Sequence, residues 1–132
     1  MNIEINDART IQDIQEEFAD EYPFLKIEFF ARPHEQGVAS DEQPHSPGHT
    51  IGSIRNRHTT GTIDVGPDSP TGAVEQEFEQ RFDLHVQIYR LQADKWLQTA
   101  GTDILTLHEQ NEIGKDASIF YNPDHQFSED SF

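Results

Sequence analysis

The chain has 132 residues, of which 25 are acidic and nine are Lys or Arg, so its formal net charge is −16. A chain of this length is expected to form one domain, and its charge argues against duplex DNA or an anionic membrane as a partner. It contains no cysteine, which excludes disulfides, thiolate metal sites and cysteine nucleophiles.

The N-terminal part of the chain predicts a strand, a helix and a second strand. Residues 2–5 form a short strand pattern, and residues 10–22 place apolar side chains at helical spacing, with Thr10 as N-cap and Pro23 beyond the end. Residues 24–32, FLKIEFFAR, alternate apolar and polar side chains, which indicates a strand with one covered face. This order is a β-α-β unit.

The same order recurs about sixty positions later. Residues 60–65 predict a strand, residues 69–82 an amphipathic helix, and residues 84–91 an alternating strand. The recurrence fits either an ancestral duplication or the shared demand of one amphipathic unit, and a single sequence does not separate the two.

Two further elements follow the second unit. A tight hairpin leads into a fifth strand at 95–99. Thr106 and Glu109 have the spacing of a capping box, which predicts a short helix that Gly114 closes.

Together these patterns favour an α+β fold. We expect a two-layer sandwich with the ferredoxin-like split order β-α-β-β-α-β, in which both helices cover one face of an antiparallel sheet, plus the added C-terminal strand and short helix. The domain would span residues 1–116 with a long polar connection at 33–60, and residues 117–132 would be a mobile acidic tail. A grasp-type sheet with one central helix is the alternative, but it gives the first helix no natural place.

The connection contains an acid-free run of 21 residues, 43–63. Arg32, Arg55, Arg57 and His58 lie in or beside it and are the candidate residues of an anion-binding site, because guanidinium groups bind carboxylates and phosphates through paired donors. The alternative is a flexible polar loop whose arginines pair with nearby acids of the chain.

The connection also gathers four of the seven histidines: His34, His45, His49 and His58. Imidazole is a common metal ligand, but the spacing of His45 and His49 places both rings together only on a helix, which Pro47 forbids. We therefore predict no metal site and no cofactor. Serine-hydrolase, phosphate-loop, dinucleotide-binding and zinc-protease motifs are absent from the sequence, so no catalytic residue is assigned.

The far face of the predicted sheet is the principal functional candidate. Phe30 and Tyr89 occupy equivalent positions of the two units, and Leu91 lies beside them; all three are expected to point away from the core. Aromatic side chains on an open sheet face favour pairing with a second copy, a protein partner or a ligand. The alternative is that the third helix or the tail covers them.

One segment carries a family resemblance. Residues 96–114, WLQTAGTDILTLHEQNEIG, resemble small uncharacterised bacterial proteins in which a Trp-containing strand leads through Thr-Asp to a short helix bearing Glu-Gln-Asn. The resemblance implies a stand-alone family and brings no activity or ligand. Separately, the scattered acids and the presence of only three lysines resemble halophile proteins adapted to molar salt.

These patterns predict a small cytoplasmic binding or self-association module, because neither an export signal nor a membrane span is found in the sequence. A homodimer or a protein partner is expected, and the acidic composition disfavours nucleic acid. The alternative is a ligand-binding protein or enzyme with an anion or metal site at 34–58, and a third hypothesis is a salt-adapted structural or regulatory partner protein.

Overall fold

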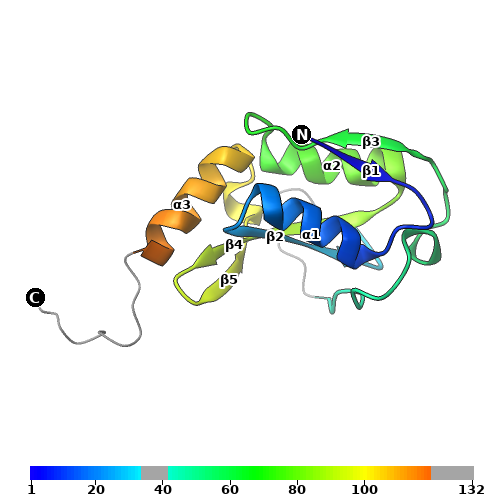
Figure 1. Ribbon diagram of the computed structural model, residues 1–132, viewed down its shortest axis with the longest axis horizontal. Coiled ribbons are helices and arrows are strands. Elements are labelled where there is room, and N and C mark those ends of the chain that lie inside the picture. The colour runs from blue at the N-terminus through cyan, green and yellow to red at the C-terminus, as the bar shows by residue number, and fades with distance from the viewer. Residues whose placement is uncertain (34–41, 120–132) are drawn as a thin grey trace, which may run out of the picture.

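The computed structural model describes residues 1–33 and 42–119, and it confirms a mixed α+β fold (Figure 1). In chain order the elements are β1 (Asn2–Ile5), α1 (Ile11–Glu21), β2 (Leu25–Phe30), the 3₁₀ turn η1 (Ile51–Ile54), β3 (Gly61–Asp64), α2 (Thr71–Phe82), β4 (His85–Gln92), β5 (Lys95–Gln98), the 3₁₀ turn η2 (Ala100–Thr102) and α3 (Leu107–Ile119). The five predicted strands and the three predicted helices are thus all present.

The strands pair in an order that the sequence did not predict. β1 pairs with β3, and β2–β4–β5 form a separate sheet; both are antiparallel. A ferredoxin-like sheet would pair β2 with β3 and β4 with β1, so that order is not confirmed among the described strands. Period-two patterning fixes which face of a strand is buried, but it does not select the neighbouring strand.

The observed pairing relates the two β-α-β units by an approximate two-fold rotation. In β1–β3, Ile3 lies opposite Ile63, its counterpart sixty positions later. In β2–β4, Glu28 lies opposite Gln87, fifty-nine positions later. A residue that meets its own counterpart across a strand pair marks the position of a two-fold axis. The recurrence in the sequence is therefore also a recurrence in space.

Both helices pack on the same face of the β2–β4 sheet. One cluster of buried side chains joins those of α1 and α2 to the inward-facing residues of β2 and β4, and it contains Ile14, Phe18, Val74, Phe78, Leu25, Ile27, Phe29, Val86 and Ile88. Phe29 and Phe78 meet edge to face with ring centroids 6.1 Å apart. Tyr22 closes the cluster toward β3, where its hydroxyl donates to the Val65 carbonyl at 2.5 Å.

Two backbone contacts hold later segments of the chain against the starts of α1 and α2. Isolated antiparallel bridges join Thr10 to Thr50 and Pro70 to Thr106. Four hydrogen bonds flank each bridge at matching offsets: Ile11 N to His49 O, Gln12 N to Pro47 O, Ile51 N to Arg9 O and Gly52 N to Asp7 O in the first, and Thr71 N to Leu105 O, Gly72 N to Asp103 O, Leu107 N to Ser69 O and His108 N to Pro67 O in the second. We call these the first and second docking contacts. They satisfy N–H groups that a helix start leaves without an intrahelical partner.

The C-terminal helix is longer than its sequence indicated. Gly114 was expected to end it, but α3 continues through Gly114 to Ile119. A Cβ at this position would lie 2.9 Å from the Phe24 Cβ and 3.1 Å from the Leu91 carbonyl, so glycine is needed for close packing and not for termination. The helix also passes the expected boundary at residue 117, and the rest of the predicted tail lies outside the described residues.

Candidate functional site

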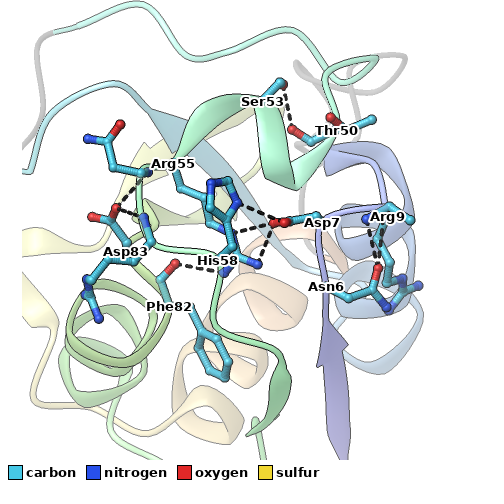
Figure 2. A network of polar contacts seen from close by, with 12 residues as sticks. Asn6, Asp7, Arg9, Thr50, Ser53, Arg55, His58, Phe82 and Asp83 are labelled. Carbon is cyan, nitrogen blue, oxygen red and sulfur yellow. Dashed lines mark hydrogen bonds and ion pairs between the residues drawn. The ribbon is translucent and has the colours of Figure 1, made fainter.

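The side chain of Arg55 is fully buried, and Asp7 holds it there. Asp7 follows β1, and its Oδ1 accepts from Arg55 Nε and Nη2 at 3.0 and 2.8 Å; Nη1 donates to the Phe82 carbonyl at 3.0 Å. His58 Nδ1 lies 2.8 Å from the other Asp7 oxygen (Figure 2). The hydrogen bond from Arg55, followed by that from His58, lowers the pKa of Asp7. The charge of Arg55 is thus neutralised inside the protein.

The end of α2 binds Arg57 and orders the chain before it. Asp83 is the C-cap of α2 with a left-handed φ of 55°, and its Oδ2 accepts from the N–H groups of Asn56 and Arg57 at 2.9 and 3.0 Å. These backbone bonds, that of Arg57 first, lower the pKa of Asp83. Arg57 Nη2 donates to the carbonyls of Glu79 and Gln80, where the helix dipole favours a cation.

Arg32 completes the predicted anion-binding set, and it pairs with Glu42 while most of its side chain is exposed. Arg55 and His58 meet at Asp7, Arg57 meets the end of α2, and so each of the four predicted residues has a protein partner. This arrangement matches the alternative interpretation, in which the cations of the connection pair with groups of the chain itself.

The histidines come together differently from what their spacing indicated. The rings of His45 and His49 have centroids 5.6 Å apart, although no helix joins them; a turn closed by the bond from His49 N to Ser46 O brings them together. The expectation that the two rings come together only on a helix is therefore wrong. His34 lies outside the described residues. Within residues 1–33 and 42–119, no three His, Asp or Glu side chains are placed to hold a metal ion.

A pocket of about 300 Å³ lies between the connection and the start of β4. We call it the connection pocket; it is lined by Ala31, His45, Ser53, Ile54, Arg55, Asn56, Asp83 and His85. His45 Nε2 and His85 Nδ1 are buried and have no hydrogen-bond partner. His85 Nδ1 does lie 3.5 Å from a Glu79 oxygen, without the geometry of a hydrogen bond. Two residues that line this pocket therefore each have a buried imidazole nitrogen without a hydrogen bond.

The environment of the connection pocket also sets the charge of one imidazole. Burial, with a smaller contribution from the neighbouring His49, lowers the pKa of His45, so this ring is neutral at pH 7. The sequence drew attention to His45 and Arg55 but missed Asp83 and His85. They follow α2 in the stretch FDLH, where an Asp after a helix is a recognisable cap but no motif connects it with residues thirty positions earlier.

The predicted sheet-face residues divide into a buried and an accessible group. Cross-strand pairing of Lys26 with Tyr89 and of Phe30 with His85 puts Phe30 and Tyr89 on one face, opposite the core. Phe30 is only 2% exposed, however, so the expectation that it is accessible to a partner is wrong. Tyr89 and Leu91 remain partly exposed. Alternation identified the face but could not reveal which part of it is covered.

At its accessible end this face carries an aromatic pair that holds a lysine. The Lys26 ammonium lies 5.1 Å from the centre of the Tyr89 ring and 5.0 Å from that of Trp96, and its other neighbour is Glu28 at 3.4 Å. Cation–π contacts of this kind orient both rings. Trp96 is 38% exposed, so the aromatic surface continues onto β5.

Comparisons with known proteins add no family to this geometry. No protein-family model, curated protein or solved structure matches the chain. The resemblance of residues 96–114 to small bacterial proteins therefore stays a prediction. In the part of the chain that the structure describes, no helix has the length and apolar character needed to cross a membrane.

Proposed function

We propose that this chain is a protein-binding module that pairs with a second copy of itself along β5. The observation that carries the proposal is the distribution of exposed apolar side chains. Among the described residues, five large hydrophobic side chains are more than a third exposed, and four of them fall between positions 96 and 113: Trp96, Leu97, Ile104 and Ile113. β5 and α3 lie at the same end of the molecule (Figure 1). A concentration of this kind is typical of an interaction surface.

The backbone of β5 supports strand pairing as the mode of association. β5 is an outer strand whose described partner is β4 alone. In a two-residue hairpin, Lys95 and Leu97 exchange hydrogen bonds with β4, which turns the backbone groups of Trp96 outward. The side chains of Trp96 and Leu97 point to opposite faces. An added strand would therefore bury an aromatic side chain on one face and an aliphatic one on the other.

A second copy is the occupant that the local charge favours. Residues 95–102 contain no acid and one lysine, in a chain of net charge −16. Two such chains repel each other least where acids are missing, and antiparallel pairing of β5 with itself presents the same surface from both sides. Salt screens the repulsion between the remainder of the two chains. Self-association should consequently strengthen as the salt concentration rises.

Sedimentation equilibrium of the full chain at ~0.1 M and ~2 M KCl tests the proposal. We expect a monomer–dimer equilibrium that shifts toward dimer at the higher concentration. Leu97→Glu should weaken the dimer by at least about tenfold, because it places a charge in the pairing surface. Thr59→Glu adds the same charge at an exposed position of the connection and should leave the equilibrium unchanged.

Two results would count against this function. A chain that stays monomeric at high concentration in both salts has no self-association to explain. Equal weakening by Leu97→Glu and Thr59→Glu would mean that net charge, and not β5, controls assembly. Binding to a basic protein instead of a second copy would show the opposite salt dependence, since screening weakens attraction between opposite charges.

We also propose that the chain works in a salt-rich cytoplasm. Its support is the charge distribution: the net charge is −16, and the acids are spread over helices and strands. At molar salt the Debye length falls to about 3 Å, and self-repulsion within such a chain is screened. The thermal midpoint of the Leu97→Glu variant, measured while it is monomeric, should rise from ~0.1 M to ~2 M KCl. A midpoint independent of salt would remove this idea.

A further inference from the structure

The connection pocket lies where α3 packs in the other half of the molecule. Beyond the second docking contact the chain continues as α3, and Gly114 of that helix lies against Phe24 and Leu91. Beyond the first docking contact only the short η1 forms, and the chain then extends toward β3. Asp83, fifty-nine positions after Phe24 and so its counterpart at the β2–β4 offset, lines the pocket instead. The pocket is thus a surface that a helix covers in one half and leaves open in the other.

Three side chains of the pocket offer groups that can accept a hydrogen bond. Arg55 lines it, but its three guanidinium nitrogens donate to Asp7 and to the Phe82 carbonyl. His45 Nε2 and His85 Nδ1 are buried without a hydrogen-bond partner. Asp83 is an ionised carboxylate whose Oδ2 is held by two backbone N–H groups. In a neutral imidazole one of the two ring nitrogens offers a lone pair, and a carboxylate only accepts.

We infer that the connection pocket binds the primary ammonium group of a small ligand, with Asp83 and the unpartnered nitrogens of His45 and His85 as its acceptors. An ammonium group has three N–H donors, one for each of these three side chains. Its charge would be compensated by Asp83, and the Glu79 carboxylate lies beside His85. The lowered pKa of His45 keeps that ring an acceptor at pH 7. This site is independent of pairing along β5.

The sign of the ligand is opposite to the one that the sequence indicated. Arginines in an acid-free run predicted an anion, but the structure pairs those arginines with groups of the chain, including the carboxylates Asp7 and Glu42. The nitrogens without a hydrogen bond at the pocket belong to two imidazoles, those of His45 and His85. A cation is therefore the better complement, and a chain of net charge −16 attracts cations at long range.

Nuclear magnetic resonance titration of the full chain with 1,4-diaminobutane, and with 1,4-butanediol as its uncharged analogue, tests the inference. The titration is run at ~1 M KCl, where non-specific attraction to the acidic surface is screened. We expect the diamine to cause saturable shifts of the amides at 53–57 and 83–85 and of the His45 and His85 ring protons. The diol should leave these signals unchanged.

Two variants of equal net charge assign the site. Asp83→Asn should weaken diamine binding by about tenfold, since it removes one charge-assisted hydrogen bond while the amide oxygen can still accept from the backbone and Asn tolerates the left-handed φ. Asp68→Asn removes the same charge from an exposed turn and should bind like the original chain. His85→Gln provides a second change inside the pocket if Asp83→Asn is poorly folded.

Three results would overturn the inference. Equal shifts with the diol would show that the charge of the ammonium is not recognised. Diamine shifts spread over the acidic surface would show non-specific attraction. Equal loss of binding in Asp83→Asn and Asp68→Asn would show that net charge matters and the pocket does not.

Discussion

The two segments that follow the docking contacts start in the same way and end differently. Each one is held against the start of a helix by a bridge with the same four flanking hydrogen bonds, at Thr10–Thr50 in the first half and at Pro70–Thr106 in the second. After that point the first segment forms η1 and then extends, whereas the second forms the thirteen-residue α3. The equivalent backbone contacts therefore fix where each segment starts but not what it forms.

The two halves also use different interactions to anchor the segment beyond each docking contact. In the first, Arg55 crosses to Asp7 and to the Phe82 carbonyl at the end of α2. In the second, Asn111 accepts from the N–H group of Phe24 beyond the end of α1, and the helix packs closely through Gly114. In the first half, a polar network anchors a short segment and leaves a pocket beside it. In the second half, α3 covers the equivalent surface. The exposed apolar side chains lie in that half, at the β5–α3 end.

The packing of α3 gives the largest expected effect. Gly114→Val should lower the free energy of unfolding by about 3 kcal/mol, because the new side chain meets the Phe24 Cβ and the Leu91 carbonyl, which cannot move independently of the backbone. Urea denaturation measures the loss. Gly101→Val is the matched control, since a Cβ there meets nothing within 4 Å. Similar stability of both variants would mean that α3 does not depend on this close approach.

Arg55 and Asn111 offer a direct comparison between the halves, as each lies five positions beyond its docking contact. Arg55→Met should cost about 2 kcal/mol, because it removes the buried donor of the Phe82 carbonyl together with the bonds to Asp7. Asn111→Ala should cost about 1 kcal/mol, for one backbone N–H left without its acceptor. Chemical denaturation of both variants checks the order, and a larger loss at Asn111 would reverse the assignment of the two anchoring modes.

Local pattern was sufficient to predict the elements of this fold but not their pairing. Thr10 was predicted as an N-cap, and Thr106 with Glu109 as a capping box; both are confirmed, because each cap depends on residues three positions apart. The pairing of β2 with β4 depends on the packing of the whole core, which periodicity does not encode. Gly114 was misread because a glycine that ends a helix and one that allows close packing look the same in a sequence.

The candidate site shows the same limit. Arg55 and His58 were selected from composition, but their partner Asp7 lies 48 positions before Arg55. The sequence could not show that this acid neutralises the predicted anion site. Asp83 and His85 were missed for the same reason, since only the folded chain brings the end of α2 to the connection. Charge within one segment predicts a ligand poorly when distant segments supply the opposite charge.

The two helix caps test whether the two docking contacts are equivalent in energy as well as in geometry. Thr10 accepts from Asp13 N, and Thr106 accepts from Glu109 N, both at 3.1 Å. Thr10→Ala and Thr106→Ala should each lower the free energy of unfolding by about 1 kcal/mol, and the two losses should agree within about 0.5 kcal/mol. Thermal melts at one salt concentration provide the comparison. A loss confined to one variant would show that the two contacts resemble each other in geometry but not in energy.

The smallest expected effect is on the pH dependence of stability, and it concerns only the half that carries the connection pocket. Because burial lowers the pKa of His45 in the folded chain, the unfolded chain takes up a proton more readily. The contribution of His45 to stability is complete above its ordinary pKa of 6.5 and is lost as the pH falls from there through the lower folded value. His45→Gln should therefore flatten the decline in stability between neutral pH and ~pH 5.5, as measured by urea denaturation.

His108→Gln, at an exposed position on α3, is the matched change in the other half. If both substitutions flatten the profile equally, the pocket does not set the pH response, and the imidazole of His45 is not held neutral by its burial there.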